Sequence, residues 1–355
     1  MILQFSQFNV FVNFAIFLVA AGVVWAAGAR ITHYANAISY QTGIGQATIG
    51  LLLLGGITSL PEIGATVTSA ASGAPDLALN NLLGSIAAQV AILALVDAFI
   101  RERALTSSIP DPMVFLQGGL NILLLAIITA GAVVGDVAIL GIGAWAWFSI
   151  LAYAFSVYLL AQSQGRRSWL VAYGGKVDHT LDEQQDKAER EANKAFEGES
   201  LRRLVLWTAG LGLVILIAGY TLSRTGDALS EQTGLGGSFV GFVLLAFATS
   251  LPELATTITA AKAGLLTLAV SDILGTNLIN VGLVFVIDLV AQGEPILSQA
   301  DSFAAFGALL GIAVTALFMI GMAERADKTV LRLGLDSLAV LLCYCAGLVI
   351  LFFLR

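Results

Sequence analysis

The sequence Thr-Ser-Leu-Pro-Glu occurs twice, at 58–62 and at 249–253, each time inside an apolar segment long enough to cross a lipid bilayer. A proline within a helix removes a backbone hydrogen bond and presses against the carbonyl four residues earlier. A charged side chain at the centre of a bilayer costs at least roughly 2.5 kcal/mol, so it normally faces a cavity, a partner or an ion. Because both halves of the chain contain this proline and this acid in the same order, the sequence predicts a symmetric pair of half-sites.

The composition indicates an integral membrane protein. Apolar residues make up 58% of the chain and charged residues only 12%, whereas soluble domains carry about 25% charged residues. A nucleic-acid partner needs clustered basic residues without balancing acids, and the sequence has none, so we expect no nucleic-acid binding. Residues 1–10 contain no Lys or Arg, so we expect 11–29 to be a retained first span rather than a cleaved signal peptide.

The hydropathy divides the chain into ten segments, each near or above the roughly 20 residues that a helix needs to cross a membrane. We therefore predict an all-α integral membrane protein with ten transmembrane helices. The expected spans are 9–29, 40–71, 77–100, 113–134, 137–161, 204–223, 237–262, 266–291, 301–322 and 331–354.

An internal repeat relates the two halves. Glu253 lies 191 positions after Glu62, and at that offset 54–97 aligns with 245–288 without a gap. Five spans per half is an odd number, so the halves must be inverted relative to each other, an architecture typical of secondary transporters. We expect a first transmembrane repeat over 1–161, a polar linker over 162–203 and a second, inverted repeat over 204–355.

The linker also sets the expected orientation. It contains eight basic and eight acidic residues, and 182–196 is predicted to form a short solvated helix. With the linker in the cytoplasm, 15 of the 17 Lys and Arg residues lie on the cytoplasmic side, as the positive-inside rule requires. We therefore expect both termini outside, in a prokaryotic inner or plasma membrane.

Each copy of the motif concentrates oxygen atoms. In a helix, Thr58 and Glu62 share a face, with Ser59 beside them, and Pro61 leaves the Ile57 carbonyl without its usual donor. Hard cations such as Ca²⁺ and Na⁺ prefer oxygen ligands, and Ca²⁺ takes six to eight of them. No Lys or Arg stands near either glutamate within its span, so a cation is the expected partner for these carboxylates.

The span that follows each motif adds further polar residues. A hydroxyl residue and an amide residue stand four apart, and each hydroxyl residue follows a glycine that would let helices approach closely. Small-residue helix packing also explains either hydroxyl alone, and interhelical hydrogen bonding also explains either amide. The residues are Gly84, Ser85 and Gln89 in the first half, and Gly275, Thr276 and Asn280 in the second.

Four other acids are expected to play smaller parts. Asp76 suits the start of a helix, where an acid complements the helix dipole. Asp272 is one turn into its span and is a candidate for lining an entry route. Asp97 and Asp288 lie near span ends, where they would attract cations to a vestibule or simply occupy the membrane interface.

At these residues the chain resembles the calcium/cation antiporter superfamily, specifically its sodium/calcium exchanger branch with two alpha repeats. The resemblance covers two regions of 44 residues and the ten-span plan. It implies ion coordination by the matching side chains and by the backbone carbonyls of Gly55 and Ala246. The matching side chains are Thr58, Ser59, Glu62, Ser85, Gln89, Thr249, Ser250, Glu253, Thr276 and Asn280.

The chain departs from that family pattern at a few positions. Gln89 and Asn280 stand where well-studied members often have Asn and Asp, and Ile57 and Ala248 replace the usual Gly before Thr-Ser. Two formal negative charges balance one Ca²⁺ or two monovalent ions. The Thr-Ser-Leu sequence favours sodium coupling, because the proton/calcium branch typically has Gly-Asn-Ala there.

The resulting prediction is an antiporter that exchanges Ca²⁺ for Na⁺ by alternating access, with no other cofactor. The resemblance further implies that spans 1 and 6 slide against the rest, at an interface for which Gly22, Gly210, Gly212 and Gly219 are suited. One alternative is a proton-coupled exchanger, in which the two glutamates take up and release H⁺. A passive cation channel is the alternative from another class. An enzyme is excluded, because the spans contain no histidine and no catalytic pairing.

Overall fold

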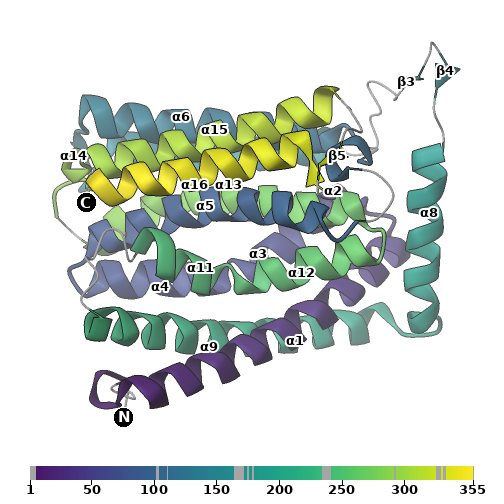
Figure 1. Cartoon of the computed structure of the whole chain (residues 1–355), viewed down its shortest axis with the longest axis horizontal. Helices are drawn as coiled ribbons and strands as arrows, with labels where there is room; N and C mark the ends of the chain where they lie inside the picture. The colour runs from purple at the N-terminus through teal and green to yellow at the C-terminus, as the bar shows by residue number, and fades with distance from the viewer. Residues whose placement is uncertain are drawn as a thin grey trace.

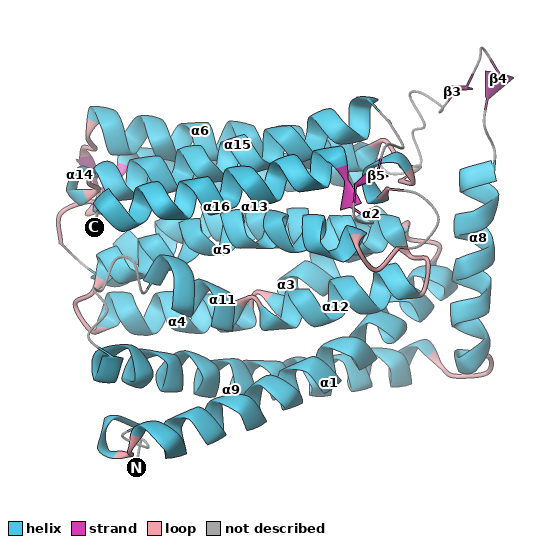
Figure 2. Ribbon diagram, in the orientation of Figure 1, coloured by secondary structure: helices cyan, strands magenta, loops and turns pink. Residues whose placement is uncertain are grey.

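The chain folds almost entirely into helices (Figure 2). The computed structural model describes residues 5–100, 104–109, 111–163, 172–173, 176–177, 180–233, 241–291, 293–324, 329–330 and 333–354. The strands among these residues form three short antiparallel hairpins. The membrane-protein fold class that the sequence predicts is therefore confirmed, with the helix count described below.

The elements of the first half and the linker follow one another as η1 (Phe5–Gln7), α1 (Val10–Thr42), α2 (Gln46–Ile49), the π-helix η2 (Gly50–Leu54), α3 (Gly55–Thr58), α4 (Leu60–Ala71), α5 (Pro75–Asp97), η3 (Leu105–Ser107), α6 (Met113–Val134), β1 (Ala138–Ile139), β2 (Ile142–Gly143), α7 (Ala144–Ser163), β3 (Ala172–Tyr173), β4 (Lys176–Val177), α8 (Thr180–Asn193) and η4 (Lys194–Phe196). The second half consists of α9 (Leu201–Thr233), the π-helix η5 (Gly241–Leu245), α11 (Ala246–Thr249), α12 (Leu251–Lys262), α13 (Leu266–Ala291), α14 (Ile296–Gln299), α15 (Ser302–Glu324), β5 (Thr329–Val330), β6 (Leu333–Gly334) and α16 (Leu335–Leu354).

The repeat seen in the sequence recurs in the elements. The helices α1 and α9 are both 33 residues long and begin 191 positions apart, and the same offset relates α7 to α16 and η2 to η5. Figure 1 shows α1 and α9 side by side and running in opposite directions. This antiparallel course is what two inverted halves require.

The structure contains eight single helices that are long and apolar enough to cross a membrane, counted over the described residues. The pair 46–58 and 60–71, which is bent by 45°, brings the number to nine if it is counted as one span. The expected span 237–262 begins on residues outside the described ones, so the count of ten stays a prediction. The helix α1 also continues to Thr42 rather than ending at 29, because its sequence contains no proline and Gly43, with a φ of 70°, ends it.

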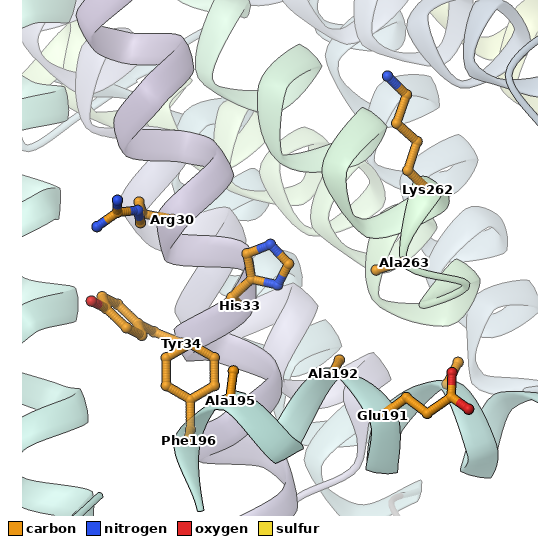
Figure 3. Close-up of a pocket in the computed structure, with 10 residues that line it drawn as sticks. Arg30, His33, Tyr34, Glu191, Ala192, Ala195, Phe196, Lys262 and Ala263 are labelled. Carbon is orange, nitrogen blue, oxygen red and sulfur yellow. The ribbon is translucent and has the colours of Figure 1, made fainter.

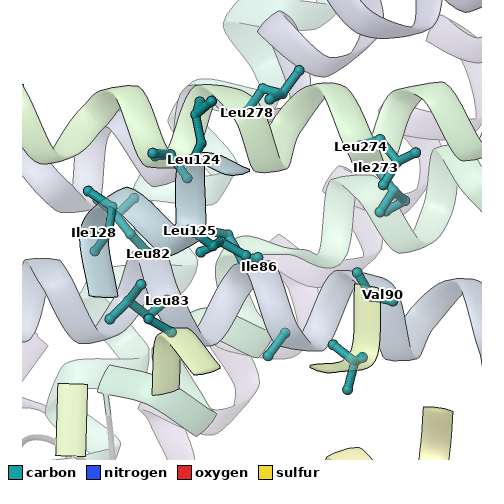
Figure 4. Packing of buried hydrophobic residues seen from close by; sticks show 14 of the residues in the cluster. Leu82, Leu83, Ile86, Val90, Leu124, Leu125, Ile128, Ile273, Leu274 and Leu278 are labelled. Carbon is teal, nitrogen blue, oxygen red and sulfur yellow. The ribbon is translucent and has the colours of Figure 1, made fainter. Parts of the chain in front are cut away.

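The two helices α5 and α13 lie at the centre of the molecule. In Figure 1 they run between a layer of α6, α15 and α16 and the broken helices, with α1 and α9 outermost. Their most apolar windows are 94% and 72% buried, against 22% for α1. Figure 4 shows their apolar side chains packed with those of α6, including Ile86, Leu125 and Leu278.

Two aspartates connect each half, through hydrogen bonds, to a hairpin of the other half. Asp97, at the end of α5, accepts hydrogen bonds from the N–H groups of Leu105 (2.6 Å) and Gly334 (2.6 Å). Asp288 does the same with Ile296 (2.7 Å) and Gly143 (2.9 Å), and every partner lies at the 191-residue offset. The side chains are only 1% and 4% exposed. These contacts do not fit an open vestibule, because buried backbone N–H groups occupy the carboxylate oxygens, and the position at the membrane interface stays a prediction.

Candidate functional site

The duplicated motif breaks a helix and places an acid at the start of the next one. The helix α3 gives way to α4 at Ser59, and α11 gives way to α12 at Ser250. The proline stands second in the new helix, where its missing N–H costs nothing. The glutamate, Glu62 or Glu253, lies in the first turn, where the positive end of the helix dipole favours a negative charge.

The structure buries all of the side chains that the sequence predicts as ion ligands. Each of them is 0% exposed, which is unusual for so many polar groups. They come from α3, α4, α5 and the α3–α4 break in the first half, and from the corresponding α11, α12, α13 and the α11–α12 break in the second. These side chains are Thr58, Ser59, Glu62, Ser85, Gln89, Thr249, Ser250, Glu253, Thr276 and Asn280.

Hydrogen bonds join side chains of the two halves. The hydroxyl oxygens of Thr58 and Thr276 are 3.3 Å apart, and those of their counterparts Thr249 and Ser85 are 3.4 Å apart. Gln89 extends this contact, because its Nε2 donates to the Ser250 hydroxyl at 3.3 Å. The predicted residues of both halves thus meet in one buried network.

Two glycines allow this close meeting. A Cβ atom on Gly84 would collide with the backbone of Phe242 in η5, and a Cβ on Gly275 would collide with the backbone of Leu51 in η2. The predicted close approach is therefore confirmed, and it occurs at the two π-helices, a form of helix often found at functional sites. Each glycine directly precedes a site hydroxyl, Ser85 or Thr276, which it carries against the other half.

The glutamates keep most of their hydrogen-bonding capacity free. Glu62 Oε1 accepts one long hydrogen bond, at 3.5 Å, from Gln89. Among the described residues, Glu62 Oε2, both Glu253 carboxylate oxygens and the Asn280 amide group have no hydrogen-bond partner. The Asn280 side chain is one methylene shorter than that of its counterpart Gln89. Two carboxylates that share one site repel each other when both are ionised, and buried carboxylates without partners are costly. A cation between them would remove both costs.

The atoms of this network that could coordinate an ion are almost all hard oxygen atoms. The Gly55 carbonyl adds to them, because it accepts from the hydroxyls of Ser59 (2.7 Å) and Thr276 (3.5 Å). In the part of the chain that the structure describes, no three His, Cys, Asp or Glu side chains converge as a conventional metal centre requires. Any ion held here would depend on hydroxyl, amide and carbonyl oxygens in addition to acids.

Asp272 belongs to the same buried network. It is 0% exposed, its Oδ1 accepts from the Thr58 hydroxyl at 3.3 Å, and its Oδ2 accepts from the Thr256 hydroxyl. The sequence suggested an entry route for Asp272 and no role for Thr256. The available signal was the spacing, since Asp272 is one helical turn before Thr276 and so shares its face.

A separate pocket of about 620 Å³ opens between α1, α8 and the end of α12. None of the predicted ion ligands lines it. Figure 3 shows two of its basic side chains, Arg30 and Lys262, on opposite sides of the opening, so they do not converge on one anion. The lining residues are Arg30, His33, Tyr34, Ala188, Glu191, Ala192, Ala195, Phe196, Lys262 and Ala263.

Comparisons with known proteins agree with this geometry. The family model described as sodium/calcium exchanger protein matches 12–172 and 203–354. An uncharacterized membrane protein of Methanocaldococcus jannaschii is 26% identical over 71% of each chain. A sodium/calcium exchanger of Methanosarcina acetivorans, MaX1, is 25% identical over 46% of this chain and 44% of its own. The solved sodium-calcium exchanger NCX_Mj, soaked with Na⁺ and Sr²⁺, has the same fold, with a TM-score of 0.66, 16% identity, and coverage of 96% of this chain and 99% of its own.

Proposed function

Because this chain belongs to the sodium/calcium exchanger protein family, we propose that it is a secondary active antiporter that exchanges Ca²⁺ for Na⁺ by alternating access. Members of this family are transporters rather than enzymes. The observation that carries the proposal is the pair Glu62 and Glu253, which come from opposite halves, are fully buried and leave three carboxylate oxygens without partners among the described residues.

The ligands of the proposed site suit a hard cation. Two carboxylates balance one Ca²⁺, and the hydroxyl and amide oxygens around them supply the remaining ligands that a six- to eight-coordinate ion needs. Soft sulfur ligands, which select other metals, are not part of the set. The proposed ligands are the side chains of Thr58, Ser59, Glu62, Ser85, Gln89, Thr249, Ser250, Glu253, Thr276 and Asn280, with the carbonyls of Gly55 and Ala246.

In this proposal α1 and α9 slide over the site and open it to alternate sides. Gly28 of α1 packs against the Pro252 carbonyl, and its counterpart Gly219 of α9 packs against the Pro61 ring. Each outer helix thus contacts the proline turn of one half-site. Of the other glycines expected at this interface, Gly212 faces Ile57, whereas Gly22 and Gly210 have no neighbour within 4 Å among the described residues.

The protein is an integral membrane protein, and we place it in a prokaryotic plasma membrane. The proposed transport halves are 1–161 and 204–355, with the 162–203 linker on the cytoplasmic side and both termini outside. The distribution of Lys and Arg supports this orientation.

Uptake of radioactive Ca²⁺ into vesicles that contain the purified protein tests the function. We expect uptake to require an outward Na⁺ gradient. Glu62→Gln and Glu253→Gln should each lower the initial rate at least about tenfold, because a lost ligand that costs about 1.4 kcal/mol of binding already changes affinity by that factor. Glu294→Gln, which removes an exposed acid, is the matched control and should transport normally.

Each rival function gives a different result in the same vesicles. Uptake that ignores Na⁺ and follows a pH gradient would show proton coupling through the same glutamates. Flux of Ca²⁺ down its own gradient, with no counter-ion on the other side, would show a passive channel and end the antiporter proposal.

A further inference from the structure

A third buried carboxylate lies beside the two glutamates. Asp272, Thr276 and Asn280 follow one another at four-residue intervals on α13, so their side chains line one face of that helix. Asp272 is fully buried, and its partner Thr256 also reaches the backbone carbonyl of Glu253, which places Asp272 next to the Glu253 turn. The region therefore holds three acids, one more than the duplicated motif supplies.

No basic side chain among the described residues pairs with Asp272. Its carboxylate accepts only from two hydroxyls, Thr58 on Oδ1 at 3.3 Å and Thr256 on Oδ2. Neutral hydroxyls do not cancel a buried negative charge, and a buried ionised carboxylate is retained only when it is paired or bound to a metal. The unpartnered oxygens of nearby Glu253 show the same shortage of positive charge.

The third acid breaks the repeat symmetry. The counterpart of Asp272 in the first half is Asn81, and the counterpart of Thr256 is Ala65. The Asn81 amide is buried and has no hydrogen-bond partner among the described residues. The carboxylate and one of its two hydroxyl partners thus occur only in the second half, so repetition of the motif does not account for them.

The hydroxyls around Asp272 are arranged to accept a cation. Thr58 also reaches the Gly55 carbonyl at 3.3 Å, and Thr256 reaches the Glu253 carbonyl at 3.0 Å. Each hydroxyl hydrogen therefore has a second acceptor. When it turns to that carbonyl, the hydroxyl oxygen is left free to face an ion beside the carboxylate.

We propose that Asp272, with the hydroxyl oxygens of Thr58 and Thr256, binds a monovalent cation of the Na⁺ type beside the Glu62–Glu253 pair. The described acids do not converge on a single ion, so Asp272 serves a separate position. One carboxylate with neutral oxygens matches a single positive charge, whereas Ca²⁺ draws on more ligand charge. This inference rests on the proposed exchange function, and it raises the number of Na⁺ ions that the site can neutralise from two to three.

Titration of bound Ca²⁺ with Na⁺ tests the inference on the purified full-length protein. In Asp272→Asn, the Hill coefficient for displacement of Ca²⁺ by Na⁺ should fall by about one, because one fewer Na⁺ is linked to Ca²⁺ release. Affinity for Ca²⁺ measured without Na⁺ should fall much less than in Glu253→Gln. Thr256→Val removes a ligand without changing charge and should lower the Hill coefficient in the same direction.

Two control variants match these changes outside the site. Asp76→Asn removes one negative charge from the first turn of α5, and Thr259→Val removes a hydroxyl from the same helix as Thr256. Both should keep the Hill coefficient of the unmodified protein. Thermal melting of every variant separates a local loss of ion binding from misfolding.

Two results would overturn the inference. One is an unchanged Hill coefficient in both Asp272→Asn and Thr256→Val. The other is a loss of Ca²⁺ binding in Asp272→Asn as complete as in Glu253→Gln, which would make Asp272 part of the Ca²⁺ position. If the unmodified protein binds no Ca²⁺, the proposed exchange fails instead. Direct binding of radioactive Na⁺ to the unmodified and Asp272→Asn proteins then decides the Asp272 position by itself.

Discussion

The two halves share two pairs of buried acids at equivalent positions, and the two pairs have different roles. Glu62 and Glu253 keep carboxylate oxygens that have no hydrogen-bond partner among the described residues, whereas the oxygens of Asp97 and Asp288 accept from backbone N–H groups. All four are deeply buried, so burial alone does not separate a candidate ion ligand from a structural acid. The two kinds of acid differ in whether hydrogen-bond donors of the protein already occupy the carboxylate oxygens.

The structural acids give a prediction at the residue scale. Asp288→Asn should destabilise the protein by about 1.5–3 kcal/mol, because the new amide N–H₂ would face a buried backbone N–H that has lost its charged acceptor. Asp97→Asn should do the same through the Leu105 and Gly334 contacts. Thermal unfolding in detergent measures both effects, and Glu294→Gln serves as the exposed control. Equal melting temperatures for all three variants would contradict the structural role.

At the scale of elements, the site is made by broken helices that cross straight ones. The breaks at Ser59 and Ser250 place an acid at each new helix start. The π-helices η2 and η5 bring backbone against α13 and α5 at Gly275 and Gly84. The position of the site therefore depends on two crossings at which a side chain has no room.

The crossings give a prediction at this scale. Gly275→Ala and Gly84→Ala should each destabilise the fold by about 1–3 kcal/mol, because the added methyl group overpacks a backbone contact. Each should also weaken Ca²⁺ binding by moving Thr276 or Ser85 outward. Gly119→Ala, on α6 with no neighbour within 4 Å among the described residues, should be neutral or stabilising, because alanine favours a helix. Calorimetry of unfolding and of Ca²⁺ binding measures both effects, and wild-type behaviour of Gly275→Ala would refute the close crossing.

At the scale of the whole molecule, the two halves form one unit rather than two domains. The helices α1 and α9 pack together as the outermost layer, and α5 and α13 pack together at the centre (Figure 1). The Asp97 and Asp288 contacts join each half to a hairpin of the other. An ion between Glu62 and Glu253 would be held by both halves at once.

The expected topology gives a prediction at this largest scale. A fluorescent reporter that matures only in the cytoplasm should be bright when inserted in the 162–203 linker and dark when fused after Arg355. The excess of Lys and Arg on the linker side is the physical reason. As a control, one further apolar span placed before the C-terminal reporter should restore its fluorescence. A bright direct fusion at the C-terminus would rule out the outward termini.

The sequence by itself determined the local features of this protein. A repeated proline and acid in apolar segments predicted the helix breaks and the paired glutamates, and the odd number of spans per half predicted inversion. The helix breaks and the buried acids follow from costs that each segment carries alone, such as a missing N–H or a charge in lipid, whereas the inversion follows from counting the spans. Only the tertiary structure decided which atoms meet across the halves. It paired the Asp288 carboxylate with a distant backbone N–H, brought Asp272 within hydrogen-bond distance of Thr58, and placed Gly28 rather than Gly22 against a proline turn. These contacts join residues more than a hundred positions apart, and helix crossings, which no local pattern encodes, bring them together.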